Sequence, residues 1–186
     1  MDISHAMLAL ARRNVPPAHF ILCDVRDLRP FRSLKEGTFD AVLSTGRSFA
    51  HLTLDSEIQT CLRAVVELLR PAGIFACDTI DARNVVANPV QRVAASTPVG
   101  LRVFRRDFVH TRLPGESTTL LTTIHWRISE GKAVIAEFDE EQRHRAFSSE
   151  ELARFLTASG LRNNVACTHF PHQPVILLAA ACKINT

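Results

Sequence analysis

The stretch FDAVLSTGRSFAHLTLDSEIQTCLRAVVELLRPAGIFACDT, from Phe39 to Thr79, decides the fold. Its first six residues and its last six are short apolar runs, which are typical of buried strands. Between them, apolar residues recur at helical spacing from Asp55 until residues 70–73, RPAG, interrupt the pattern. A strand, a helix and a second strand in this order predict a right-handed crossover in the parallel sheet of an α/β domain.

The preceding residues continue this alternation. Ser4 is placed to cap a helix that runs to about Asn14, where two prolines follow. The apolar positions of this helix are Met7, Leu8, Leu10 and Ala11. The apolar run HFILC, residues 19–23, then predicts a buried parallel strand that ends at Asp24.

After Asp81 the pattern changes to antiparallel strands. Polar and apolar side chains alternate over residues 99–111, 117–128 and 132–147, which predicts strands with one exposed face. Turn residues at 113–116 and 129–132 join them. The side chains expected on one face are Leu120, Ile124, Trp126 and Ile128.

The end of the chain predicts a helix and two strands. Ser148 and Glu151 form a capping box at the start of this helix, and Gly160 ends it. Strands are expected near residues 164–170 and 174–182.

Composition restricts the kind of protein. A length of 186 residues with 46% hydrophobic content fits one globular domain. The 22 basic and 19 acidic residues are scattered, so we expect no nucleic-acid or membrane partner. The five cysteines are odd in number and lie mostly in apolar runs, which indicates reduced thiols and a cytoplasmic protein. The sequence contains neither a secretion signal nor an apolar run of the roughly 18 residues that a membrane span requires.

One group of residues could suggest a metal. Cys167, His169 and His172 are close in sequence, but they supply three ligands with no fourth nearby. We therefore expect no metal site.

Five segments of the sequence together resemble the class I S-adenosylmethionine-dependent methyltransferases. They are, in order, DISHAMLALAR, the VRDL that follows Cys23 and Asp24, FDAVLS, LLRPAGIF and HRAFSSEELARFLTASGL. The resemblance is nearest to the small-molecule N-methyltransferases, which include amino-sugar and glycine-type enzymes. It implies an incomplete Rossmann-like methyltransferase sheet in one domain, residues 1–186, with helices on both faces and a terminal antiparallel hairpin. An antiparallel β lid is expected as an insertion at residues 99–147.

This resemblance implies S-adenosylmethionine as the cofactor. Asp2 would accept hydrogen bonds from the ribose hydroxyls, and Asp24 from the adenine amine. Val25 would lie near the adenine ring, and Met7 would pack on its face. The ordinary alternatives are a helix N-terminal anion for Asp2, an Asx turn for Asp24 and core filling for Met7.

The segment after residue 44 would pass beneath the methionine part of the cofactor. Thr45 and Gly46 would allow close backbone approach there, and Ser48 and His51 would lie near the methyl group. A base is needed only if the acceptor arrives protonated. His51 is the candidate for the catalytic residue, although a surface histidine is an equal reading. Asp78 and His125 are further candidates for the base.

The predicted function is methyl transfer to a small-molecule acceptor, an amine. Nucleic-acid methyltransferases that grip a flipped base carry an Asn or Asp followed by two prolines and an aromatic residue, whereas residues 44–47 read STGR here. The alternative is a methyltransferase-like module without catalysis, which binds a partner or forms a homodimer. A nicotinamide-dependent reductase is a weaker third reading because the sequence lacks a Gly-rich turn.

The beginning of the chain departs from the family pattern. The Gly-rich turn should precede the acidic ribose ligand by roughly 20 residues, but only Met1 precedes Asp2, and the seven glycines are isolated from one another. We expect that the domain is N-terminally incomplete, and that Met1 corresponds to an internal valine codon, GUG, read as a start. Without the first strand and its cofactor loop, we expect the chain as given to be marginally stable and inactive.

Overall fold

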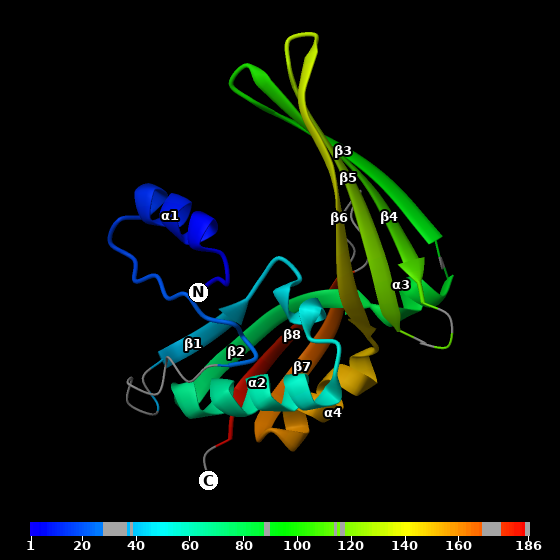
Figure 1. The fold of residues 1–186 in the computed structure, drawn as a ribbon. Helices are drawn as coiled ribbons and strands as arrows, with labels where there is room; N and C mark the ends of the chain where they lie inside the picture. Colours follow the sequence, from blue (N-terminus) through cyan, green and yellow to red (C-terminus); the bar gives the residue numbers. More distant parts are fainter. Residues whose placement is uncertain are drawn as a thin grey trace.

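The computed structural model describes residues 1–27, 37, 39–87, 90–113, 115, 118–168 and 176–184. The α/β fold class expected from the sequence is confirmed (Figure 1). The elements, in chain order, are α1 (His5–Asn14), β1 (Phe39–Ser44), the 3₁₀ helix η2 (Ser48–His51), α2 (Asp55–Leu68), β2 (Leu69–Asp81), α3 (Ala82–Ala87), β3 (Val90–Val99), β4 (Arg102–Arg112), β5 (Thr119–Glu130), β6 (Ala133–Phe147), α4 (Ser149–Ala158), β7 (Leu161–Thr168) and β8 (Ile176–Lys183).

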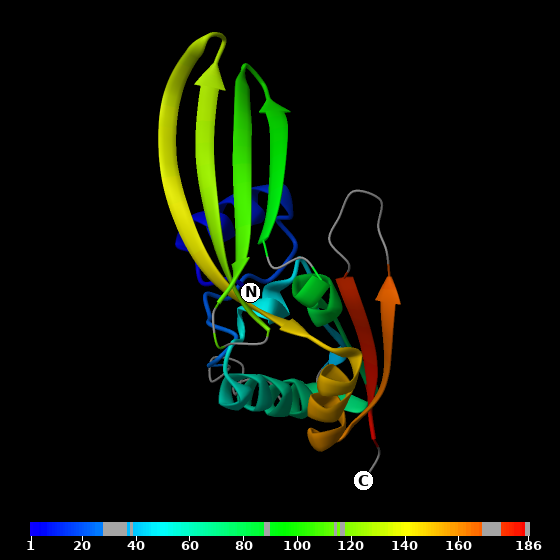
Figure 2. The same cartoon turned by 90° about the vertical axis from the view of Figure 1, so that its right-hand side faces the viewer.

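Strand β2 lies at the centre of the sheet. β8 pairs with one of its edges antiparallel, and β7 pairs with β8. The other edge is shared, because β1 pairs with it in parallel up to Cys77 and β6 pairs with it in parallel at Ile80 and Asp81. Strands β3 to β6 form an antiparallel meander that projects away from the helices (Figure 2).

The predicted strand–helix–strand unit is present. β1 ends at a tight turn, α2 follows, and β2 begins directly after α2. Helix α2 buries Ile58, Cys61, Leu62 and Val65, which are spaced as the helical period requires. β1 is less buried than expected, since Leu43 is 68% exposed. The reason is that only one of its edges is paired, the one that faces β2.

The strand predicted at residues 19–23 is wrong. This segment makes only an isolated parallel bridge between Leu22 and Asp2. The Asp2 N–H donates to Ile21 O at 3.2 Å, and the Cys23 N–H donates to Asp2 O at 3.1 Å. A single bridge forms because no strand lies between this pair and β1 to extend the ladder within the described residues.

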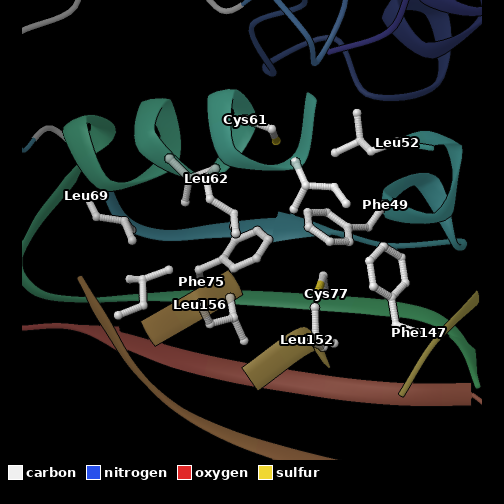
Figure 3. Close-up of a cluster of buried hydrophobic side chains, with 13 residues drawn as sticks. Phe49, Leu52, Cys61, Leu62, Leu69, Phe75, Cys77, Phe147, Leu152 and Leu156 are labelled. Carbon is white, nitrogen blue, oxygen red and sulfur yellow. The ribbon is translucent and has the colours of Figure 1, made fainter. Parts of the chain in front are cut away.

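The core lies between β2 and two helices on one of its faces. Phe75 and Cys77 of β2 pack against α2, α4 and η2 (Figure 3). Phe49 is central, since its ring centroid lies 6.1 Å from that of Phe75 and 5.7 Å from that of Phe147. A second cluster joins Ile80 to α3 and to Leu120 at the base of the meander. Because side chains alternate along a strand, Ile80 belongs to the opposite face from Phe75. That face is covered only near Ile80, since Ile74 on the same face is 49% exposed.

Helix ends follow the sequence predictions. Ser148 caps α4 by accepting from the Glu151 N–H at 3.1 Å. Ser4 caps α1 by accepting from the Met7 N–H at 3.2 Å. Of the residues of α1, only Leu8 is buried, which leaves this helix weakly attached to the core.

The antiparallel sheet is larger than the lid predicted at residues 99–147. It already begins with β3 at Val90, and its last strand continues into the core at Ala146 and Phe147. The turn predicted at 113–116 lies partly outside the described residues, as do parts of the strands predicted at 164–170 and 174–182. Within the described ranges, none of the helices combines the length and the apolar character needed to cross a membrane.

Candidate functional site

A cavity of about 720 Å³ lies between the N-terminal segment, residues 1–27, and β1. Its floor consists of apolar side chains of the core, among them Phe49, Cys61 and Phe75. Polar groups from separate parts of the chain line the rest. A mainly apolar hollow of about 300–1,000 Å³ with a few placed polar groups is the usual form of a small-molecule site.

The cavity collects most of the site residues predicted from the sequence. The predicted residues that line it are Asp2, Asp24, Val25, Thr45, Ser48 and His51. Gly46 is not among the lining residues, although its neighbour Thr45 is. Met7 does not line the cavity either, because it lies on the outer side of α1 with 55% of its surface exposed. Core filling therefore does not describe Met7, and its contact with the adenine ring stays a prediction.

Asp2 holds the start of the chain in place. Its carboxylate Oδ1 accepts from the Ser4 N–H at 2.8 Å, just before α1 begins. This contact matches the ordinary alternative, an anion at a helix N-terminus. The carboxylate also lines the cavity, and a carboxylate has about four lone-pair sites, so it retains capacity for a ligand hydroxyl.

Asp24 forms an ion pair that sequence reasoning missed. Arg26 Nη2 lies 2.6 Å from Asp24 Oδ2, and Arg26 Nε lies 3.0 Å from Oδ1. The Arg26 N–H also donates to Oδ1 at 2.9 Å, which is the Asx turn considered as the alternative. The hydrogen bonds from Arg26 hold the pKa of Asp24 below its usual value. The only signal for this pair was the i, i+2 spacing of opposite charges beside an apolar run.

The turn after β1 is fixed by a residue of β2. Gly46 and Arg47 are both left-handed, with φ of 71° and 64°. The Arg47 N–H donates to Asp78 Oδ1 at 2.9 Å, and Ser48 Oγ donates to Thr45 O at 2.8 Å. An αL conformation is uncommon for arginine, and the Asp78 hydrogen bond stabilises it. Asp78, proposed from the sequence as a base, is thus engaged in shaping the turn.

His51 meets the antiparallel sheet at the cavity wall. Its ring centroid lies 4.5 Å from that of His144 on β6. Thr122 Oγ1 lies 3.0 Å from His144 Nδ1 and 2.8 Å from His110 Nδ1. The alternation over residues 99–111 and 132–147 predicts strands with one exposed face, but His144 is only 9% exposed. The register of three strands, which the sequence does not specify, brings these groups together.

Burial lowers the pKa of all three histidines. It is the largest cause for His51, His110 and His144, and the cationic Arg47 lowers each of them further. The pKa of His144 falls to about 4, also because of His51 and His110. These imidazoles are therefore neutral near pH 7, and each one taken alone is a weaker base than a free histidine.

His125, the third candidate for the base, lies elsewhere. Its Nδ1 is 2.8 Å from Asp139 Oδ1, and its Nε2 is 3.0 Å from Glu137 Oε1. These carboxylates raise the pKa of His125, and all three groups lie on the exposed face of the meander. We therefore remove His125 from the candidate bases.

Two buried cysteines, Cys61 and Cys77, are unreactive. Burial raises the pKa of Cys61 and Cys77 to about 12, which keeps both thiols protonated. In the part of the chain that the structure describes, no group of His, Cys, Asp and Glu side chains is arranged to hold a metal ion. His169 and His172 lie outside the described residues.

The fold and the cavity define a class of protein. A parallel strand pair with a polar-rimmed cavity at the end of β1 is typical of α/β domains that bind nucleotides or nucleosides. Two carboxylates at the rim and an apolar floor fit a nucleoside, which offers hydroxyls, an exocyclic amine and a flat ring.

Comparison with known proteins narrows this class. Residues 1–73 match the family model described as a methyltransferase domain. The dTDP-3-amino-3,4,6-trideoxy-alpha-D-glucopyranose N,N-dimethyltransferase of Streptomyces venezuelae is 26% identical over 170 residues. That alignment covers 87% of this chain, and the chain spans 65% of the length of that relative.

Two solved structures are similar over nearly the whole chain. Streptomyces venezuelae DesVI has a TM-score of 0.78 at 23% identity, over 98% of this chain and 72% of that one. The sugar N-methyltransferase KedS8 of Streptoalloteichus has a TM-score of 0.78 at 19% identity, over 98% and 69%. Residues 1–73 thus match a methyltransferase domain, and the whole chain has the fold of S-adenosylmethionine-dependent methyltransferases, which supports the resemblance noted in its sequence. Among the similar structures, CalS10 holds S-adenosylmethionine and a Burkholderia thailandensis N-methyltransferase holds S-adenosylhomocysteine.

Proposed function

We propose that this protein transfers a methyl group from S-adenosylmethionine to an amino group of a small-molecule acceptor, of the amino-sugar type. The observation that carries the proposal is the convergence of separately predicted residues on one cavity. The named acceptor of the Streptomyces venezuelae relative supports an amino sugar as the substrate class. The cofactor would supply an electrophilic methyl group on a sulfonium, so the protein has to bind, orient and exclude water.

Each rim residue has a role in this proposal. Asp2 would accept from the ribose hydroxyls, and Asp24 would accept from the adenine amine while Arg26 orients it. Thr45 and Ser48 would lie beside the methionine part, on the turn that Asp78 fixes. His51 would face the acceptor, where the cavity meets the antiparallel sheet.

Calorimetry with S-adenosylmethionine tests the cofactor site. Replacing Asp24 by Asn should weaken binding by about 1–3 kcal/mol, because a charged acceptor is lost from the adenine contact. Asp40→Asn is the matched control. Asp40 lies on β1, pairs with Arg70 of β2 and does not line the cavity. Equal binding by the wild type and the Asp24 variant would remove Asp24 from the site.

Mass spectrometry tests the transfer itself. The chain is incubated with S-adenosylmethionine and dTDP-3-amino-3,4,6-trideoxy-D-glucose, the acceptor named for the relative, and with the same sugar carrying a hydroxyl in place of the amine. Methylation of the amine alone supports the proposal. Methylation of the hydroxyl sugar contradicts the amine as the attacked group, and methylation of neither contradicts transfer by this chain.

A module without catalysis is the second candidate. It is favoured by the Arg26 ion pair, which already satisfies the Asp24 carboxylate in the free protein. If Arg26 blocks the site, Arg26→Met should strengthen S-adenosylmethionine binding. If Arg26 instead orients Asp24 toward the adenine amine, the same substitution should weaken binding. Such a module would act as a homodimer, which sedimentation would detect as self-association in the absence of cofactor.

The proposal includes a cytoplasmic location. Cys23, Cys61, Cys77 and Cys182 are free thiols, as is usual in a reducing compartment.

A further inference from the structure

Three polar side chains form a continuous line across the inner face of the antiparallel sheet, the face toward η2. His110 on β4 lies opposite Thr122 on β5, and His144 on β6 lies diagonal to it, beside Leu120. The Thr122 hydroxyl lies 2.8 Å from His110 Nδ1 and 3.0 Å from His144 Nδ1. Thr122 is 1% exposed, so water does not compete for its hydroxyl. The line is therefore closed to solvent at its centre.

The single hydrogen of the Thr122 hydroxyl imposes different tautomers on the two histidines. A hydroxyl donates one hydrogen bond and accepts others, so it can donate to only one Nδ1. The second neutral histidine must then carry its proton on Nδ1 and donate to Thr122 Oγ1. Consequently one histidine exposes a basic Nε2 and the other exposes an Nε2–H. A proton that enters at the basic Nε2 leaves at the other Nε2 if the hydroxyl passes its hydrogen along.

The surroundings keep this line neutral and connect it to the cavity. The charged and titratable groups that face it are Arg47 and His51 from the η2 region, Arg106 and Arg112 from β4, and Glu140 from β6. Arg106 is held over the rings of Phe108 and Trp126, and Glu140 accepts from Trp126 Nε1 at 3.2 Å. His144 contacts His51, which lines the cavity, whereas His110 is only half-buried. The line thus runs from the cavity wall toward a more exposed position.

We propose that His144, Thr122 and His110 form a proton relay that removes a proton from an ammonium acceptor before methylation. This inference rests on the proposed function. An N–H bond of the ammonium breaks and its proton forms an N–H bond at His144 Nε2. The His144 Nδ1 proton then moves to Thr122 Oγ1, whose own hydrogen moves to His110 Nδ1. The His110 Nε2 proton leaves to water, and the acceptor nitrogen keeps the electron pair that forms the new N–C bond.

Nitrogen-15 NMR of the histidines tests the relay independently of activity. At pH 7 the wild type should show His144 with its proton on Nδ1 and His110 with its proton on Nε2. Thr122→Val removes the hydroxyl at nearly constant shape, and His144 should then revert to the Nε2–H tautomer that free histidine favours. Finding Nε2–H on both histidines of the wild type would overturn the relay.

The pH profile of kcat/KM tests its role, with dTDP-3-amino-3,4,6-trideoxy-D-glucose as the probe. Below the pKa of the amine, Thr122→Val should lower kcat/KM by about tenfold or more, since proton removal is lost. Above that pKa the amine is already neutral, so the variant should approach the wild-type rate. Thr122→Ser keeps the hydroxyl and should retain the wild-type profile. Thr123→Val is the matched control on the opposite face of β5 and should change nothing.

The remaining outcomes separate the relay from the proposed function. A decrease by the same factor at every pH would indicate a structural role for Thr122 and overturn the relay. If Thr122→Val does not fold, His110→Gln removes the half-buried end of the line and should show the same rescue at high pH. A wild type that binds no S-adenosylmethionine refutes the proposed function and the relay's role together. If the wild type methylates the acceptor while both His110 and His144 carry their proton on Nε2, the relay is refuted and the proposed function is not.

Discussion

Two regions of this molecule are packed in opposite ways. Around β2, the side chains of Phe49, Phe75 and Phe147 are at most 2% exposed and contact two helices (Figure 3). In the N-terminal segment, residues 1–27, the large apolar side chains Ile3 and Met7 are 70% and 55% exposed. The isolated bridge of that segment, between Asp2 and Leu22, lies within the segment itself, and Arg26 Nη1 lies 3.5 Å from Glu57 Oε1 on α2.

This difference separates the region that stabilises the fold from the region that supplies binding residues. Apolar area removed from water supplies most of the folding free energy, so the region around β2 should carry the global stability. The N-terminal segment supplies Asp2 and Asp24 to the cavity while burying little of itself. Elements with few buried contacts open at low free-energy cost, so a ligand in the cavity should order this segment.

The largest effect is expected in the packed region. Phe147→Ala should lower the free energy of unfolding by about 3–5 kcal/mol, because it leaves a cavity beside Phe49. Ile3→Ala in the N-terminal segment should change it by less than about 0.5 kcal/mol. Urea denaturation followed by circular dichroism measures both. Similar losses for the two variants would show that the segment is part of the same packed core.

Acid should destabilise the packed region through His144. Its pKa is about 4 when folded, whereas an unfolded histidine titrates at about 6.5. The folded state therefore binds fewer protons in this interval, and its stability is complete above about pH 6.5 and falls as the pH decreases toward 4. Between pH 7 and pH 5 the loss from His144 should be on the order of 2 kcal/mol.

Denaturation at a series of pH values checks this expectation. His144→Asn should flatten the dependence between pH 5 and pH 7, leaving the smaller contributions of His51 and His110, whose pKa values are also lowered. A His5→Asn variant is the control from the N-terminal segment. An unchanged slope in the His144 variant would show that another group titrates in this range.

A smaller effect is expected where β8 meets α2. Lys183 Nζ donates to Val66 O and to Leu69 O, each at 2.8 Å, at the carboxyl end of α2. Lys183→Met should cost about 1–2 kcal/mol, since a cation and two hydrogen bonds leave a helix C-terminus. Lys132→Met, in the exposed turn before β6, should be neutral in the same thermal melts. Equal melting temperatures for the two variants would contradict this role.

The smallest global effect is expected at the Ser4 cap. Ser4→Ala should cost α1 about 1 kcal/mol of local stability. Because α1 buries only Leu8, the global melting temperature should hardly move. Hydrogen exchange at the Leu8 amide, which donates to Ser4 O, should accelerate in the variant. A clear fall in the melting temperature would show that α1 unfolds together with the core.

Local patterns in the sequence predicted most of the helices and central strands. The spacing of Ile58, Cys61 and Val65 defined α2, and Ser148 and Gly160 marked the ends of α4. The run at 19–23 was misread because an apolar run reports strand propensity and not the presence of a partner strand. Strand β3 was missed because the sequence of 90–99 lacks a regular alternation, and pairing with β4 determines its structure.

The candidate site was predicted in part. The position after β1 can be read from the sequence, and Thr45 lines the cavity as expected. Asp24 lines the cavity with Asp2 although the strand predicted before it does not form. Their roles toward the cofactor stay predictions. The Arg26 pair and the contact of His144 with His51 depend on rotamers and strand register, which single-sequence patterns do not specify.

Strand β6 has a consequence for engineering substrate specificity. It pairs with β5 along the meander and then with β2 at Ala146 and Phe147, so one continuous strand serves both the antiparallel sheet and the core. A chimera that exchanges residues 99–147 between relatives would cut through β3 and replace both core residues. An exchange of residues 90–142 would transplant β3 to β5 and most of β6, and would leave the recipient's own His144, Ala146 and Phe147 in place. The second design should yield folded hybrids with the donor's choice of acceptor.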